Sequence, residues 1–413
     1  MSRSCRCLNC ITPPHMLKKL LESKDTNIRQ AALNTLLATS RLRGEREVRS
    51  VAGFLMASAN GRRTVYNLRN GTVLSSAVVA RTEDGETSAD GSVNNAFDGL
   101  GATRQFYKDV FNRNSIDGKG MRLDGYVHRG VRYNNAFWDG QQMVFGDGDG
   151  VIFTDFTTSL DVIAHELAHG VTEFTANLDY HKQPGALNES MSDVFGSLVK
   201  QWALGQTADE ADWLIGAELF TPGIQADALR SLKAPGTAYD NELLGRDPQP
   251  DHMDRYENLP DTEEGDFGGV HINSGIPNKA FYLTAVGIGG YAWETVGHIW
   301  YESLLASHAF TQFQDFADTT YLKAGLLYGS AEQEIVSDAW RQVGIRITGL
   351  PLSAPRRQPR VEERSGDSLA ALTRQIEILG SQVKSLAKDV KGLKDKRMPV
   401  PTPQFESPGT KIL

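Results

Sequence analysis

The chain has 413 residues, of which 40 % are hydrophobic and 23 % are charged, and its formal net charge is −8. This composition is ordinary for a globular protein, and the length allows two or three domains. The negative charge argues against nucleic acid as the main partner. No apolar run approaches the roughly eighteen residues that span a bilayer, so we expect no transmembrane segment.

Residues 1–50 form a leader that differs from the rest of the chain. It holds all three cysteines, Cys5, Cys7 and Cys10, so the remainder can form no intrachain disulfide. Its first residues carry positive charge but lack the apolar core of roughly seven residues of a conventional secretory signal. We therefore expect the protein to be cytoplasmic, or secreted by a signal-independent route. Two amphipathic helices are predicted, over 16–23 and 27–42, with Gly44 as the stop.

The segment 51–160 is predicted to be rich in strands. Alternating apolar residues over 62–80, around Asn70-Gly71, predict a β-hairpin, and further short strands continue to about residue 156. One helix is predicted over 94–112. Residues 161–350 have a mainly helical pattern, with helices near 275–286, 291–307 and 313–328 in addition to those that carry the motif described below.

The C-terminal region has three predicted parts. Residues 351–366 are rich in proline and charge, as in a flexible linker. Within 367–397, apolar residues recur three and four apart, with leucine at every d position, which favours a parallel dimeric coiled coil. The alternative is a lone amphipathic helix that docks on the rest of the protein or on a membrane surface. Residues 398–413 are interrupted by proline and are expected to be disordered.

The sequence His165-Glu166-Leu-Ala-His169 carries the strongest chemical signal. Residues i and i+4 share one face of a helix, so both histidines can hold one metal ion, while Glu166 remains available as a general base towards water. Glu189 offers a third protein ligand. Two imidazoles and one carboxylate leave a position open for water, as in a catalytic zinc site. Asp193, one turn later, can accept the second ring N–H of a histidine ligand.

Three further segments accompany this motif: residues 133–150, 188–193 and 266–275. Together they resemble the thermolysin family of zinc metallopeptidases, and the resemblance runs from about Thr64 to about Leu350. It implies an α+β fold with two lobes, a β-rich N-terminal lobe and an α-helical C-terminal lobe, with the zinc cleft and the substrate channel between them.

The resemblance also implies roles for individual residues. Zinc would be bound by His165, His169 and Glu189, and Glu166 would be the general base. His271 matches the histidine that donates a hydrogen bond to the oxyanion, Asp266 matches the acid that orients it, and Tyr180 matches a second oxyanion donor. An imidazole kept protonated by a carboxylate suits this task, because it stabilises negative charge as that charge develops.

Other matched positions concern the substrate. Asn135 and Ala136 match the strand that pairs with the substrate backbone, and Arg230 matches the arginine that binds the carbonyl on the leaving-group side. Five apolar residues match the main specificity pocket, which predicts cleavage before large hydrophobic residues, although the alternative for each is plain core. These five are Phe153, Phe156, Val162, Ile215 and Leu229.

The sequence departs from the family at the calcium cluster. Asp161 and Asp212 match calcium-binding acids, but Lys200, Leu214 and Ala217 stand where relatives carry further acids. Calcium needs roughly six to eight oxygen ligands, and a lysine among them opposes binding. We therefore expect the double calcium site to be lost. The glycine-rich run 146–150 is interpreted as a structural turn.

The leader resembles the short propeptides of the protealysin branch of the family, which help to cover the active site. Its removal between Gly44 and Asn60 would produce the mature enzyme. Alternatively, His15 and the cysteines reach the zinc and block its open position.

The leading hypothesis is a zinc-dependent metalloendopeptidase that acts on polypeptide substrates. The alternative from another class is an inactive scaffold that binds peptides or proteins through the same cleft. Glu166 and His271 argue against the scaffold, which has no need of a base or an oxyanion donor. An amidase on a non-peptide substrate is weaker still, because Asn135 and Arg230 read a peptide backbone. The predicted coiled coil adds a homodimer to the expected partners.

Overall fold

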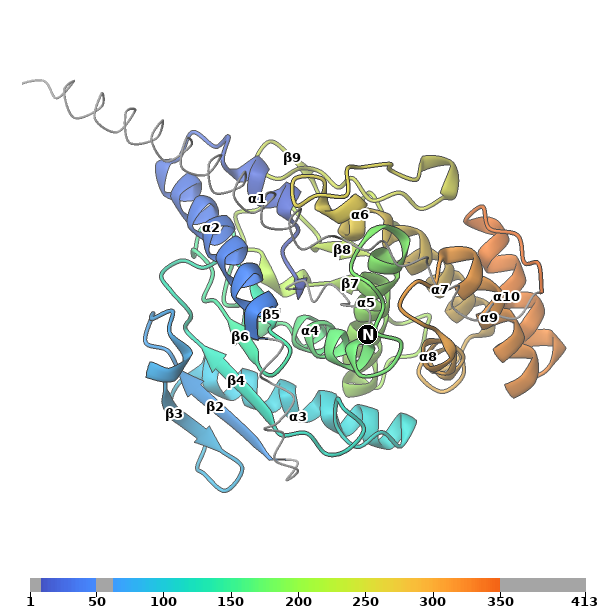
Figure 1. The fold of residues 1–413 in the computed structure, drawn as a ribbon, viewed down its shortest axis with the longest axis horizontal. Coiled ribbons are helices and arrows are strands. Elements are labelled where there is room, and N and C mark those ends of the chain that lie inside the picture. The colour runs from blue at the N-terminus through green and yellow to red at the C-terminus, as the bar shows by residue number, and fades with distance from the viewer. Residues whose placement is uncertain (1–8, 50–61, 350–413) are drawn as a thin grey trace, which may run out of the picture. The chain divides into compact units, whose positions relative to one another are not determined.

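The computed structural model describes residues 9–49 and 62–349. The predicted linker 351–366, coiled coil 367–397 and tail 398–413 lie outside these residues. In Figure 1 the sheet and the later helices lie on opposite sides of two central helices, α4 (Leu160–Glu173) and α5 (Lys182–Leu204). The predicted two-lobed α+β fold is confirmed.

A mixed six-stranded sheet forms most of the N-terminal lobe, in the strand order β1-β5-β6-β4-β2-β3. The pairs β2–β4 and β4–β6 are parallel, whereas β2–β3, β5–β6 and β1–β5 are antiparallel. The predicted hairpin is formed by β2 and β3, although the connection between them runs from residue 68 to 77. The strands are β1 (Asn9–Cys10), β2 (Arg63–Asn67), β3 (Val78–Thr82), β4 (Leu123–Val127), β5 (Ala136–Trp138) and β6 (Met143–Phe145).

One long helix, α3 (Gly91–Phe111), packs across this sheet, close to its predicted range. It begins where the Asp90 side chain accepts a hydrogen bond from the backbone N–H of Ser92, and it ends at Asn112, whose φ of 50° is left-handed. Side chains of α3 such as Phe97 and Leu100 join the buried core that also contains residues of α4 and α5.

The C-terminal lobe is mainly helical, as predicted, with two differences. Residues 291–295 are not helical, because Gly289 and Gly290, both with positive φ, lead into a turn before α8. A further helix, α10, follows α9. The elements of this lobe are α6 (Asp266–Asn273), α7 (Gly275–Ile288), α8 (Val296–Ala306), α9 (Phe313–Leu327), α10 (Ser330–Gln342) and the paired strands β7 (Leu214–Ile215) with β8 (Arg230–Ser231) and β9 (Asp240–Asn241) with β10 (Gly245–Arg246).

The leader folds against the rest of the chain as two helices, α1 (Pro14–Leu20) and α2 (Thr26–Arg49). The predicted stop at Gly44 is wrong, because the helix continues to Arg49. A single glycine costs a helix only about 1 kcal/mol, and good helix formers follow it. Apolar side chains of both helices, including Met16, Leu20 and Ile28, are buried in the main core. Among the described residues, no helix has the length and apolar character needed to cross a membrane.

Candidate active site

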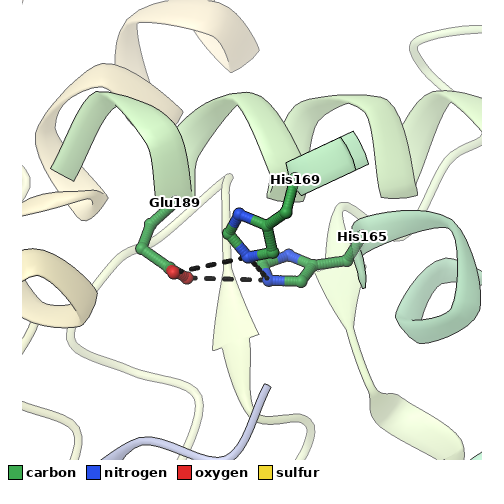
Figure 2. Close-up of side chains that lie close together, drawn as sticks. All are labelled: His165, His169 and Glu189. Atoms are coloured by element: carbon green, nitrogen blue, oxygen red, sulfur yellow. Dashed lines mark hydrogen bonds and ion pairs between the residues drawn. The ribbon is translucent and has the colours of Figure 1, made fainter. Parts of the chain in front are cut away.

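The helices α4 and α5 bring His165, His169 and Glu189 together (Figure 2). Their nearest ligand atoms all lie within 4.8 Å of one another, and all three side chains are fully buried. The Nε2 atoms of the two histidines are 3.0 Å apart. A carboxylate oxygen of Glu189 lies 3.4 Å from Nε2 of His169 and the other lies 3.6 Å from Nε2 of His165.

The Nδ1 atoms of both histidines lie close to acceptor oxygens. Asp193 Oδ1 lies 2.9 Å from Nδ1 of His165, and Asn188 Oδ1 lies 2.8 Å from Nδ1 of His169. Each Nδ1 therefore carries the proton, so both Nε2 lone pairs point at the same small space. Burial lowers the pKa of His169 to about 3, which keeps its ring neutral as a metal ligand must be.

Polar atoms without a partner complete the argument for a metal. The Oε2 atom of Glu189 and the Oε1 atom of Glu166 are buried and have no hydrogen-bond partner among the described residues. Buried acceptors left in this state cost free energy. Two nitrogen lone pairs, one ligand carboxylate and an adjacent carboxylate fit a single zinc ion with an open position.

A buried ion pair fixes Asp193. The Arg230 guanidinium donates hydrogen bonds to both carboxylate oxygens of Asp193, at 2.8 to 3.1 Å, and Asn278 donates to Oδ2 at 2.9 Å. Burial opposes ionisation, but Arg230 and His165 hold the pKa of Asp193 well below its usual range. Neither Asn188 nor Asn278 was singled out from the sequence. Asn188 stands beside Glu189 in the motif, whereas Asn278 comes from a distant helix with no local signal.

The opposite side of the site holds His271, Asp266 and Tyr180. Asp266 Oδ1 lies 2.6 Å from Nδ1 of His271, and its Oδ2 accepts the backbone N–H of His271 at 2.8 Å. Burial disfavours the charged ring, yet Asp266 raises the pKa of His271 above its ordinary value. The hydroxyl of Tyr180 lies 3.2 Å from Nε2 of His271 and donates to Glu189. Two donors therefore face the same space as the metal ligands.

Glu166 lies between the ligands and the strand β5. It accepts the backbone N–H of Trp138 at 3.0 Å. Burial and the nearby charge of Glu189 raise the pKa of Glu166 well above its ordinary value. A carboxylate that holds a proton readily and reaches the open side of the site is suited to proton transfer.

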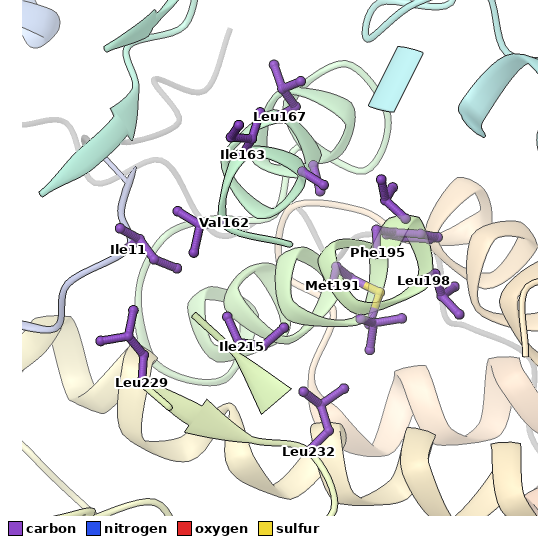
Figure 3. Close-up of a cluster of buried hydrophobic side chains, with 14 of the residues drawn as sticks. Ile11, Val162, Ile163, Leu167, Met191, Phe195, Leu198, Ile215, Leu229 and Leu232 are labelled. Carbon is purple, nitrogen blue, oxygen red and sulfur yellow. The ribbon is translucent and has the colours of Figure 1, made fainter. Parts of the chain in front are cut away.

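The predicted substrate-binding residues contact the leader. The backbone of Ile11 donates to the carbonyl of Ala136 and accepts from Arg230, and the N–H of Thr12 donates to Asn135 Oδ1. All five predicted pocket residues are buried in the main core, together with Ile11. Figure 3 shows Ile11 between Val162 and Leu229, with Ile215 nearby. Phe153 and Phe156 pack together, with ring centroids 5.6 Å apart, and Phe153 also stacks on Phe220.

His15 is not among the described residues whose ligand atoms gather at this site, which argues against the alternative in which it blocks the zinc. Its Nε2 lies 2.9 Å from the hydroxyl of Tyr239. Cys10 packs with Tyr133, Phe137 and Val144 in a separate apolar cluster. Successive side chains of an extended strand point to opposite faces, so Cys10 points away from the face to which Ile11 points. Cys5 and Cys7 lie outside the described residues.

Sequence and structure comparisons define the class. Residues 45–173 match "Thermolysin metallopeptidase, catalytic domain", and residues 176–345 match "Thermolysin metallopeptidase, alpha-helical domain". The chain belongs to the thermolysin family of metallopeptidases and is a zinc-dependent metalloendopeptidase. The comparisons give no support to an inactive scaffold.

Within the family the chain is similar to protealysin-like enzymes. It is 46 % identical to an extracellular metalloprotease of Pectobacterium carotovorum subsp. carotovorum, over 82 % of this chain and 96 % of the relative. It is also 46 % identical to the protease PrtS of a Photorhabdus species, over 82 % and 92 %. The solved precursor of protealysin from Serratia proteamaculans superposes with a TM-score of 0.73 at 48 % identity, covering 82 % of this chain and 99 % of that chain.

These relatives correct one expectation. The first relative is named as an extracellular enzyme, which contradicts the cytoplasmic location expected from the N-terminal residues. The apolar core of a conventional secretory signal indicates only one route of export. The lack of such a core near the N-terminus therefore does not predict a cytoplasmic location.

Proposed function

We propose that this endopeptidase cuts on the N-terminal side of large hydrophobic residues and is made as a zymogen whose leader covers its own cleft. The position of Ile11 supports both parts. Its large apolar side chain is buried in the main core near Val162, Leu229 and Ile215. Such a pocket favours a bulky apolar side chain because burial of each CH₂ group contributes about 0.8 kcal/mol.

The roles of the site residues follow from their positions. His165, His169 and Glu189 hold zinc, which supplies Lewis-acid polarisation of the substrate carbonyl and of water. Glu166 removes a proton from the attacking water and delivers it to the leaving amine.

Charge on the carbonyl oxygen is met by His271 and Tyr180, whose hydrogen bonds strengthen as negative charge develops. Asp266 keeps His271 charged and oriented. Asp193 fixes the tautomer of His165 in which Nδ1 carries the proton. Asn135, Ala136 and Arg230 bind the backbone of an extended peptide.

The substrate preference is tested by incubating the processed enzyme with an unstructured polypeptide, with and without a zinc-selective chelator. Sequencing the new N-termini should give mainly Leu, Ile, Phe or Val, and the chelator should stop the reaction. New N-termini that are mainly small or charged would overturn the preference without affecting the assignment as an endopeptidase.

The zymogen is tested with full-length protein. The wild-type chain should process itself to a species that begins between Gly44 and Asn60, a region that extends beyond the described residues. The Glu166→Ala variant should stay intact. Identical trimming of this variant would assign the processing to another protease.

Two further parts of the proposal concern metal and assembly. Lys200 ion pairs with Asp161, Asp212 and Glu218, which supports the loss of the double calcium site. Dimerisation rests on the apolar heptads of 367–397, a segment outside the described residues. Sedimentation of the full chain and of a chain ending at residue 366 tests it, and equal masses per particle would exclude this interface.

A further inference from the structure

The leader enters the active site as an added strand. β1 pairs antiparallel with β5, with Asn9 opposite Trp138 and Cys10 opposite Phe137. The pairing continues one residue further, because the N–H of Ile11 donates to the carbonyl of Ala136 at 3.3 Å. An extended peptide bound along a strand edge in this way has its register set by main-chain hydrogen bonds.

Contacts with catalytic groups fix which peptide bond lies at the reaction centre. The carbonyl oxygen of Cys10 lies 3.2 Å from Nε2 of His271, the group proposed to stabilise the oxyanion. On the other side of the same bond, the backbone N–H of Ile11 lies near enough to Glu166, the proposed general base, to favour its charged form.

The next residues continue the arrangement on the leaving-group side. The carbonyl oxygen of Ile11 accepts a hydrogen bond from Arg230 at 3.1 Å, and the N–H of Thr12 donates to Asn135 Oδ1 at 3.0 Å. The side chain of Ile11 is buried in the main core beside Val162 and Leu229, whereas that of Cys10 lies in the separate cluster with Phe137 and Val144. A shift of one residue would exchange these two faces, so the register is specific.

We propose that the Cys10–Ile11 peptide bond is an internal processing site that the chain cuts with its own active site. This inference rests on the proposed function, because it uses the same base and oxyanion donors. The oxygen of water bonds to the carbonyl carbon of Cys10, and Glu166 takes one of the water protons. The proton passes to the nitrogen of Ile11 as the C–N bond breaks, which leaves a carboxylic acid on Cys10 and an amine on Ile11, and the acid then releases the second water proton to solvent.

The cut differs from removal of the leader. After it, α1 and α2 still hold residues 11–49 on the enzyme through buried side chains such as Met16, Leu17 and Leu20. The reacting groups belong to one folded chain, so the rate does not depend on protein concentration. Loss of residues 1–10 therefore leaves the rest of the leader in place and does not depend on cleavage between Gly44 and Asn60.

Mass spectrometry of the intact, zinc-loaded full chain tests the proposal. We expect a species that begins at Ile11 to accumulate at a rate unchanged by tenfold dilution, and to be missing in Glu166→Gln. Ile11→Asp should slow this cut at least tenfold, because the apolar pocket rejects a carboxylate, while Ile11→Leu keeps it. Lys24→Ala, which changes an exposed leader residue, is the matched control and should behave as wild type.

A readout independent of turnover tests the geometry. In the Glu166→Gln chain the amides of Ile11 and Thr12 should exchange with deuterium at least ~100-fold more slowly than in an unfolded peptide, and Ile11→Asp should remove this protection. Unprotected amides would overturn the proposal.

The internal site and the proposed function can fail separately. If the processed enzyme hydrolyses an added polypeptide while the Cys10–Ile11 bond of the full chain stays intact, only the internal site is wrong. If neither is cut, the proposed function fails as well. A first cut at any other leader bond would also overturn the internal site.

Discussion

The helices α4 and α5 together build two buried polar clusters that are neutralised in different ways. In the first, His165, His169 and Glu189 direct unshared electron pairs at one another. In the second, Lys200 Nζ lies 3.2 Å from Asp161 and 2.9 Å from Asp212. Asp161 and Lys200 are on the same two helices as the ligands, about one turn before His165 and about three turns after Glu189.

The difference shows where each cluster obtains its positive charge. The first cluster has acceptors without partners and needs a cation from solution. The second carries its own cation: burial opposes the charge on Lys200, but Asp161, Asp212 and Glu218 raise its pKa. One helix pair thus carries a site that fits a metal ion and a cluster that contains its own cation, and the predictions below separate them.

The largest expected effect is on the first cluster. Glu166→Gln should lower the rate of peptide hydrolysis by ~10² to 10⁴, because general-base transfer is lost. Zinc content should stay near one per chain, since Glu166 adjoins the ligands but is not one of them. Rate measurements and metal analysis on the same samples check this, with Glu334→Gln on the exposed surface as the control. Retained activity in a metal-replete variant would contradict the mechanism.

In the second cluster, Lys200→Met should lower the free energy of unfolding by about 3 kcal/mol, because Asp161 is left buried without its cation. Denaturant titration at pH 7 measures this, and adding Asp161→Asn should recover most of the loss.

The matched control for this variant is Lys323→Met. Lys323 pairs with the more exposed Glu302, so the expected loss is below about 1 kcal/mol. Equal losses at the two lysines would show that the Lys200 cluster is no more than a surface ion pair.

Metal titrations compare the two clusters directly. A zinc-selective chelator should lower the midpoint of thermal unfolding by several degrees and remove activity, because zinc binds the folded chain. Millimolar calcium should shift that midpoint by about a degree or less, since Lys200 already occupies the second cluster. A rise of many degrees, half-saturated at micromolar calcium, would contradict this interpretation.

The smallest effect concerns a third way to neutralise acids, an imidazole between the half-buried side chains of Asp147 and Asp90. His128 lies 2.8 Å from each carboxylate. The hydrogen bond to Asp147 raises the pKa of His128 to about 9, against the effect of burial. The stabilisation is therefore complete below about pH 6.5, the value for a free histidine, and is lost as the pH rises through 9.

This linkage predicts that His128→Asn costs about 1 kcal/mol at pH 6 and little at pH 10, after allowance for screening by solvent. Asparagine tolerates the positive φ of 59° at this position. Unfolding measured across this pH range checks the slope. A loss independent of pH would mean that His128 acts by packing alone.

Local sequence determined much of the metal site. The helical repeat alone aligns His165 with His169 and separates Glu166 from them, so both the ligands and the base could be predicted before any fold was known. The place of Lys200 among acids could also be predicted from the sequence, because the resemblance to the thermolysin family put it at a calcium-site position together with Asp161 and Asp212. The stop at Gly44 and the start of the helix near 291 were misjudged, since the strength of single glycine signals depends on the residues around them.

Tertiary structure alone decided the rest. His271 reaches the site through a turn in which Asp266 and Phe267 adopt φ values of 55° and 51°, a conformation that their own preferences disfavour and that only surrounding contacts can hold. Asn278 meets Asp193 from a helix far along the chain. The register of Ile11 on β5 depends on pairing across more than a hundred residues, and no local periodicity encodes such a contact.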